Sequence, residues 1–442
     1  MAHKDLDLNK PIKEQLDIVE ENIIGELKDF QKATVERIDH LYRSGQKRVL
    51  VSDEVGLGKT LIARGTIAKF AKLRKEEDDD LVKIIYICSN RAVAGQNLEK
   101  LRIINDLNVE DTNNSRLSMQ HLDIFNQEYN KHNLNNYIQI ISLTPQTSFK
   151  ISNREGTYNE RALIFTILKR INYYKDIKDK LGELLRYDVK YWQGAIDWYE
   201  YQVTECNEQS NGKYLEYMLK EVEKSLKTIQ YYDKSLYEYI KDYCLSDEKT
   251  KYETKNLIVQ LRSLFADISL NKLEPDLIIM DEFQRFKDLI TTDENSEMDR
   301  ITKKFFNDTT RVLMLSATPY KMYSTLDEID EANIDEHYSE FLNVIKFLNE
   351  NQIEEFEEVW EDYSIKLREI RNKDFSVLSV KNKAEDALYS NICRTERITE
   401  EKLENIVKQD SKYENNSLKV SKADIKSYLD VQKLIDNIDT NV

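Results

Sequence analysis

Residues 52–60 read Ser-Asp-Glu-Val-Gly-Leu-Gly-Lys-Thr and directly follow the apolar run Val49-Leu50-Val51. A strand that enters a glycine-bearing loop predicts a phosphate-binding loop, because glycine lets backbone N–H groups close on phosphate oxygens. Lys59 adds a positive charge for the β- and γ-phosphates, Thr60 offers a hydroxyl to Mg²⁺, and the helix predicted from Leu61 favours an anion at its N-terminus. The loop therefore predicts a nucleoside triphosphate with Mg²⁺ as ligand, bound by Glu54, Val55, Gly56, Leu57, Gly58, Lys59, Thr60 and Leu61.

A second apolar run, Leu277-Ile278-Ile279-Met280, ends in Asp281-Glu282. A continuous apolar run of this length is typical of a buried parallel strand. At the carboxyl end of such a strand, Asp281 can hold Mg²⁺ and Glu282 can orient or deprotonate the attacking water. The alternative is an ordinary solvated acidic pair. The phosphate loop upstream favours the catalytic interpretation.

A third apolar run, Val312-Leu313-Met314-Leu315, is followed by Ser316-Ala317-Thr318-Pro319, where proline ends the strand. The hydroxyls of Ser316 and Thr318 could bond to the loop after Asp281 and sense the γ-phosphate. Taken alone, the segment also fits a simple polar turn.

The order of these three segments resembles motifs I, II and III of the superfamily-2 helicases. Residues 53–60 resemble motif I of the SWI/SNF-like branch, where Asp replaces the first glycine of the general pattern. Residues 281–288, Asp-Glu-Phe-Gln-Arg-Phe-Lys-Asp, resemble that branch's motif II, which usually reads Asp-Glu-Ala-His-Arg-(apolar)-Lys-Asn. Gln284 stands in the place of the histidine, and its amide can still bridge to Ser316 or Thr318.

Further segments fit the same family over about residues 25–150 and 272–400. Leu27-Lys28-Asp29-Phe30-Gln31 resembles the Q motif, in which Gln31 would select adenine and hence ATP; the alternative is an exposed helix glutamine. Ile392-Cys393-Arg394-Thr395-Glu396-Arg397 resembles the arginine-rich block that closes the first lobe. The segments after strands predicted at 84–88 and 138–143 occupy the places of motifs Ia and Ib. There the resemblance implies nucleic-acid contacts by Asn90, Arg91, Gln96, Thr144 and Gln146.

The sequence predicts an α/β fold, a RecA-like P-loop lobe with a mainly parallel sheet, a large α-helical insertion and a helical C-terminal extension. The predicted parts are an N-terminal extension (1–24), the lobe's first part (25–154), the insertion (155–270), the lobe's second part (271–325) and the extension (326–442). In the insertion, apolar residues from Leu215 to Tyr243 recur at a spacing of three to four, as in a helical hairpin or coiled coil. Its aromatic and basic residues between 169 and 201 suit single-strand stacking, a helical core or a protein-partner surface.

The net charge of −16 argues against a generally basic nucleic-acid binder and predicts weak, salt-sensitive binding through a narrow track. No apolar run approaches membrane-spanning length, and the N-terminus lacks an apolar signal core. The 4 cysteines are scattered without metal-ligand spacing. We therefore expect a cytoplasmic protein with reduced thiols.

The resemblance implies a nucleic-acid-dependent ATPase or helicase that couples ATP hydrolysis to movement on, or remodelling of, DNA. Double-stranded DNA is favoured and RNA is possible. In this family a second RecA-like lobe supplies arginine fingers, and after Thr318 no pattern for such a lobe is found. We therefore expect a second lobe in the same longer chain or in a separate subunit, and little hydrolysis by this chain alone. The alternatives are a nucleotide-gated protein-interaction module without motor activity and a different P-loop enzyme, such as a small-molecule kinase.

Overall fold

The computed structural model describes residues 10–89, 91–104, 116–129, 137–144, 155–283, 304–307, 309–317, 342–349, 353–369 and 377–395. All of them belong to the first of two compact units, Met1–Thr395. The second unit is Glu396–Val442. No helix among the described residues is both long and apolar enough to cross a membrane.

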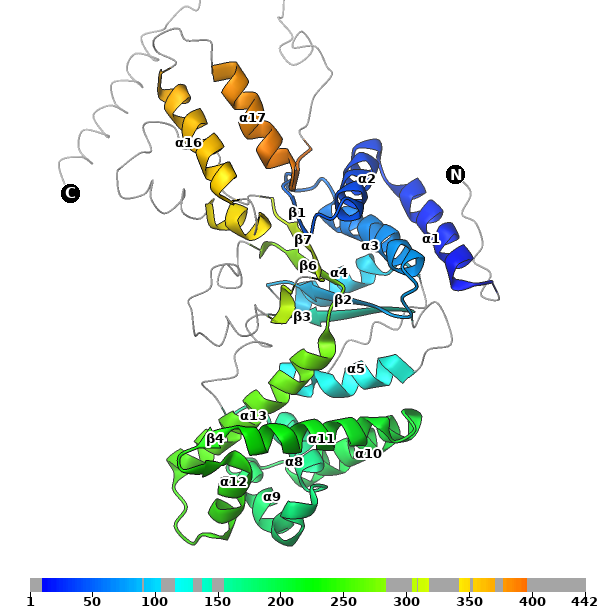
Figure 1. The fold of residues 1–442 in the computed structure, drawn as a ribbon. Coiled ribbons are helices and arrows are strands. Elements are labelled where there is room, and N and C mark those ends of the chain that lie inside the picture. Colours follow the sequence, from blue (N-terminus) through cyan, green and yellow to red (C-terminus); the bar gives the residue numbers. More distant parts are fainter. Residues whose placement is uncertain are drawn as a thin grey trace, which may run out of the picture. The chain divides into compact units, whose positions relative to one another are not determined.

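A six-stranded sheet forms the centre of the described chain, and every strand runs parallel to its neighbours in the order β3-β2-β6-β7-β1-β8 (Figure 1). The strands are β1 (Arg48–Val51), β2 (Val82–Ile87), β3 (Ile138–Leu143), β6 (Leu277–Asp281), β7 (Arg311–Leu315) and β8 (Ile392–Cys393). Since the strands are parallel, their carboxyl ends share one edge of the sheet. The predicted α/β fold with a mainly parallel sheet is confirmed.

Side chains alternate between the two faces of this sheet, as the pleat requires. Val51, Tyr86 and Ile279 point into a core shared with helices α1 (Ile12–Glu26), α2 (Asp29–Arg43), α3 (Lys59–Glu76) and α4 (Arg91–Leu101). Their neighbours Ile278 and Met280 point into the opposite core. Asp281, two residues beyond Ile279, therefore falls on the face that α3 and α4 cover.

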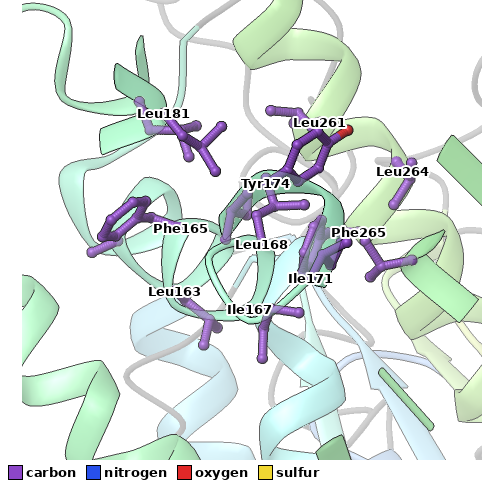
Figure 2. Close-up of a cluster of buried hydrophobic side chains, with 14 of the residues drawn as sticks. Leu163, Phe165, Ile167, Leu168, Ile171, Tyr174, Leu181, Leu261, Leu264 and Phe265 are labelled. Carbon is purple, nitrogen blue, oxygen red and sulfur yellow. The ribbon is translucent and has the colours of Figure 1, made fainter. Parts of the chain in front are cut away.

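The predicted insertion is helical, as expected. Its helices are α8 (Tyr158–Leu168), α9 (Lys178–Arg186), α10 (Gln193–Gln209), α11 (Lys213–Thr228), α12 (Leu236–Leu245) and α13 (Lys251–Leu273), with a 3₁₀ segment η2 (Asn172–Ile177). Figure 2 shows how side chains of α8 and α13, among them Leu163, Ile167 and Phe265, gather in its buried core. Helix α5 (Gln120–Tyr129), which follows β2 in the chain, contributes Leu122 and Phe125 to the same core.

The apolar stripe of the insertion forms a helical hairpin, not one continuous coiled coil. Between α11 and α12, β4 (Gln230–Tyr231) pairs antiparallel with β5 (Lys234–Ser235), and Asp233 lies in the turn. The buried row of α11 differs from the predicted one. It consists of Tyr214, Met218, Val222 and Leu226, whereas Leu215 and Leu219 are only partly buried. Tyr214 takes the inner position because its hydroxyl finds a buried partner in His121 at 3.1 Å.

The aromatic residues of the insertion divide into buried and exposed sets. Tyr174 and Trp192 belong to the core, as does Tyr199. Tyr191, Trp198 and Tyr201 are 80%, 57% and 58% exposed. The helical-core interpretation therefore holds for the first set, whereas the second set is exposed to solvent, as are Tyr158, Tyr232 and Tyr252.

The C-terminal part of the described chain contains α16 (Ile353–Glu369) and α17 (Val377–Tyr389), which pack on each other. This helical character was predicted. The short strand β8 was not, and it pairs with β1 on the outer side of the sheet. Residues 392–393 thus belong to the sheet that carries the phosphate loop.

Candidate nucleotide-binding site

The predicted phosphate loop joins β1 to α3 at the carboxyl edge of the sheet. Gly56 and Gly58 have φ values of +85° and +81°, a region that glycine adopts without strain. A Cβ atom on Gly58 would also lie 2.5 Å from the Gln31 amide nitrogen. The Lys59 ammonium donates hydrogen bonds to the carbonyl oxygens of Asp53 and Glu54 at 2.9 and 3.1 Å, so the loop curls around this lysine. Val55 and Leu61, at the loop's rim, are 76% and 40% exposed.

Gln31 is held against the phosphate loop. Its amide nitrogen donates to the Leu57 carbonyl at 2.9 Å, and its amide oxygen accepts from the Lys28 N–H at 3.0 Å. The side chain is only 4% exposed, so the alternative of an exposed helix glutamine is wrong. The Q-motif placement beside the loop fits, while adenine selection stays a prediction.

The acidic pair lies level with the phosphate loop. Leu315 on β7 is opposite Val51 on one side and opposite Asp281 on the other. Adjacent strands lie about 4.8 Å apart, so the ends of β1 and β6 are separated by about 10 Å, a distance that a metal–triphosphate can bridge. Glu282 is exposed, and its φ of +52° is uncommon for a residue with a side chain. Backbone strain of this kind is often found at functional sites.

Electrostatics also connect the two halves of the site. Burial lowers the pKa of Lys59, and the carboxylates of Asp53, Asp281 and Glu282 oppose this shift. Burial raises the pKa of Asp281, as does the neighbouring Glu282, while Lys59 opposes the rise. The lysine therefore lies within the field of both members of the acidic pair.

The oxygen atoms at this edge suit a magnesium ion. Mg²⁺ in nucleotide sites usually takes one or two carboxylates together with substrate phosphates. Asp281 and the Thr60 hydroxyl offer such oxygens. No group of three or more His, Cys, Asp or Glu side chains among the described residues forms a self-sufficient metal cage. The donor set fits an ion that arrives with its nucleotide.

Two residues that the sequence analysis did not connect with Asp281 contact its carboxylate. The Tyr86 hydroxyl donates to Asp281 Oδ2 at 2.6 Å, and the Asn97 amide donates to the same oxygen at 3.2 Å. Asn97 also donates to the Tyr86 hydroxyl at 2.8 Å. In the sequence, the signals were a tyrosine within the aliphatic run of β2 and the position of Asn97 beside Gln96 in the place of motif Ia.

Asp53, which replaces the usual glycine, has a structural partner far along the chain. Its Oδ1 accepts a hydrogen bond from the Thr395 N–H at 2.7 Å, and the side chain is fully buried. The Thr395 hydroxyl lies 3.3 Å from that of Thr34 on α2. Burial raises the pKa of Asp53, against the effect of the Thr395 N–H and Lys59. This aspartate therefore ties the phosphate loop to the segment after β8.

Of the remaining predicted residues, the structure describes some and leaves others outside its described part. Ser316 is buried at the end of β7, and its N–H donates to the Val51 carbonyl at 3.1 Å, so it lies between the loop and the acidic pair. Gln96 is exposed on α4, and Thr144 is buried after β3. For Arg91 the structure gives only the backbone, at the start of α4. The other predicted residues, Asn90, Gln146, Gln284 and Thr318, lie outside the described part.

Comparison with known proteins agrees with this geometry. Residues 24–172, about a third of the chain, match the family model described as type III restriction enzyme, res subunit. That model represents the N-terminal RecA-like domain of helicase superfamily 2. No curated protein and no solved structure matches the chain. Residues 24–172 are thus similar to a superfamily-2 helicase-like ATP-binding domain, the type found in ATPases and helicases.

Proposed function

We propose that this chain is the first RecA-like lobe of a SWI/SNF-like ATPase that couples ATP hydrolysis to movement on, or remodelling of, DNA. The observation that carries the proposal is the strand register: Leu315 pairs with Val51 on one side and with Asp281 on the other, so the phosphate loop and the acidic pair follow the same edge of one sheet. The SWI/SNF-like assignment is supported by Asp53 at the first position of the loop and by the sequence of residues 281–288.

Each residue of the site would have a distinct role in hydrolysis. On nucleotide binding, Lys59 would exchange its carbonyl partners for oxygens of the β- and γ-phosphates, and the loop N–H groups would hold the phosphates. Asp281 and Thr60 would hold Mg²⁺, which neutralises phosphate charge when bound. Glu282 would orient the attacking water and accept its proton. Ser316, with Gln284 and Thr318, would relay the state of the γ-phosphate.

Turnover would depend on a second lobe, within a longer chain or in a separate subunit. In other NTPases an arginine supplied in this way raises the rate on the order of 10³–10⁵-fold. The lobe alone would bind duplex DNA weakly, near Gln96 at the carboxyl edge, with a steep salt dependence because the chain is acidic. RNA is the alternative polymer. Tyr191, Trp198 and Tyr201 on the insertion would meet a protein partner, in a cytoplasmic setting that suits 4 cysteines that form no disulfide.

A direct test measures ATP hydrolysis with duplex DNA, single-stranded DNA and RNA, in the presence of the completing lobe. Duplex DNA should stimulate turnover, and Glu282→Gln should lower it by about 10²–10⁴-fold while nucleotide binding persists. Glu274→Gln, an exposed carboxylate just before the amino end of β6, is the matched control and should leave turnover unchanged. Hydrolysis that no nucleic acid stimulates would instead support a nucleotide-gated interaction module.

A further inference from the structure

Tyr86 stands out in β2 because its neighbours Ile84, Ile85 and Ile87 are aliphatic. It is 1% exposed and pairs in register with Ile279 of β6. From that position its hydroxyl reaches the carboxylate two residues further along, at the end of β6. The hydrogen bond to Asp281 Oδ2, 2.6 Å long, is in the range of strong charge-assisted bonds.

Asn97 brings a second element to the same oxygen. It lies on α4, whose residues Ala94 and Leu98 are anchored in the core beneath the sheet. The Asn97 amide donates to Asp281 Oδ2 and to the Tyr86 hydroxyl. One oxygen of the carboxylate is thus held from β2 and from α4, and the rotation of the carboxylate about its own bond is restricted.

Helix α4 also faces the solvent at the carboxyl edge. It begins at Arg91, shortly after β2 ends, and Gln96, the residue before Asn97, is exposed. A ligand that contacts this helix and shifts it by about 1 Å would lengthen the Asn97 bonds beyond their working range, or would bring them to their best geometry. Two adjacent residues of α4 therefore connect solvent with the metal-binding carboxylate.

We propose that Tyr86 and Asn97 are positioning residues that couple Asp281 to nucleic acid bound along α4. In this arrangement, duplex DNA fixes α4, α4 and Tyr86 fix the carboxylate, and the oriented carboxylate would hold Mg²⁺ when the nucleotide is bound. DNA and Mg·ATP then raise each other's affinity by the same factor, as linkage requires. The inference rests on the proposed function and adds the route by which its two ligands communicate.

The test measures binding, not turnover, on the full chain at low ionic strength. A fluorescent, non-hydrolysable ATP analogue is titrated with Mg²⁺, with and without saturating duplex DNA. For the unaltered protein DNA should tighten binding by a factor in the range of about 5–150. In Asn97→Ala and in Tyr86→Phe this factor should fall to about 1, while each ligand alone still binds. Replacing Mg²⁺ with EDTA should abolish the coupling in the unaltered protein.

Tyr137→Phe is the matched control, because Tyr137 is a buried tyrosine whose hydroxyl bonds instead to the Ala71 carbonyl at 3.1 Å. It should keep the full coupling factor. Coupling that persists in both Asn97→Ala and Tyr86→Phe overturns the positioning role alone. Loss of nucleotide binding in these two variants without DNA also overturns it, because the residues would then merely support the site. An unaltered protein in which DNA has no effect on the analogue would overturn the coupling, whereas the proposed function would fail only if no nucleic acid stimulates hydrolysis in the presence of the completing lobe.

Discussion

The carboxyl edge of the sheet and the helical insertion differ in how their charged side chains are paired. At the edge, Lys59 lies among three carboxylates, and the non-glycine residue Glu282 has a positive φ. In the insertion, the Glu160 carboxylate and the Arg262 guanidinium, each 1% exposed, form an ion pair at 2.8 Å. Ser118 and Arg116 add further contacts to the same carboxylate.

The difference indicates separate tasks. A site that must accept a charged ligand keeps excess charge and strained backbone, because the ligand completes it. A body that only has to hold its shape pairs its buried charges internally and surrounds them with apolar side chains. Changes to buried residues of the insertion should therefore mainly alter the free energy of unfolding, and changes to Lys59 or the acidic pair should mainly alter ligand binding.

The largest expected effect comes from Glu160→Gln. The substitution keeps the size of the side chain but removes the negative charge opposite the buried Arg262 guanidinium, which costs about 3–5 kcal/mol. Urea unfolding measures the loss, and affinity for the ATP analogue should not change in the folded protein. Glu221→Ala, which removes an ion pair with the exposed Lys224 on α11, should cost less than about 1 kcal/mol. Equal losses for the two variants would contradict the contrast.

The next effect concerns pH. Burial lowers the pKa of His121 to about 3, against an ordinary value near 6.5, so the unfolded chain binds one more proton between these pH values. The contribution of the neutral, buried imidazole to the free energy of unfolding is fully present above pH 6.5. It is lost as pH falls, and the loss reaches about 2 kcal/mol at pH 5. His121→Gln cannot take up this proton. Urea unfolding at pH 7 and pH 5 should show a smaller pH dependence for the variant, and an unchanged dependence would refute the assignment.

Local chemistry explains which parts of this contrast could be predicted from sequence. The phosphate loop, the acidic pair and the parallel strands follow from glycine conformation and from runs of apolar residues, which are properties of short segments. The contacts to Asp281 could not be predicted, because Asn97 and Asp281 are 184 positions apart and no sequence motif links the two residues. The same holds for Asp53 and Thr395, which are 342 positions apart. Resemblance could assign an aspartate to position 53 but not its partner.

The insertion shows a second limit of prediction. Periodicity identified its helices, but it placed Leu215 and Leu219 in the seam where Tyr214 and Met218 lie. Because leucine is more hydrophobic than tyrosine, the sequence favours leucine for the buried position. Only the structure shows that the Tyr214 hydroxyl has a buried hydrogen-bond partner in His121. Tertiary partners decide such choices between adjacent positions.

A smaller effect, at the edge, should come from Asp53→Ala. It removes the acceptor of the Thr395 N–H and leaves that partly buried group without this hydrogen bond, at a cost of about 1 kcal/mol. Hydrogen exchange should become faster in the amides of residues 393–395. Asp53→Asn keeps an oxygen at the same place and should preserve most of the protection. If alanine and asparagine had the same effect, the charge of Asp53 would matter more than its hydrogen bond.

The smallest effect should come from Trp198→Ala, which compares an exposed with a buried tryptophan of the insertion. Trp198 is 57% exposed, and its ring centroid lies 6.3 Å from that of Tyr201. Little buried area is lost, so the free energy of unfolding should change by no more than about 0.5 kcal/mol. Trp192→Ala, in contrast, empties a 9%-exposed position that packs on Phe165 and should cost about 3–5 kcal/mol. A large loss of stability for Trp198→Ala would mean that this side chain supports the helical core. Trp198 would then not be an exposed residue available for a protein partner.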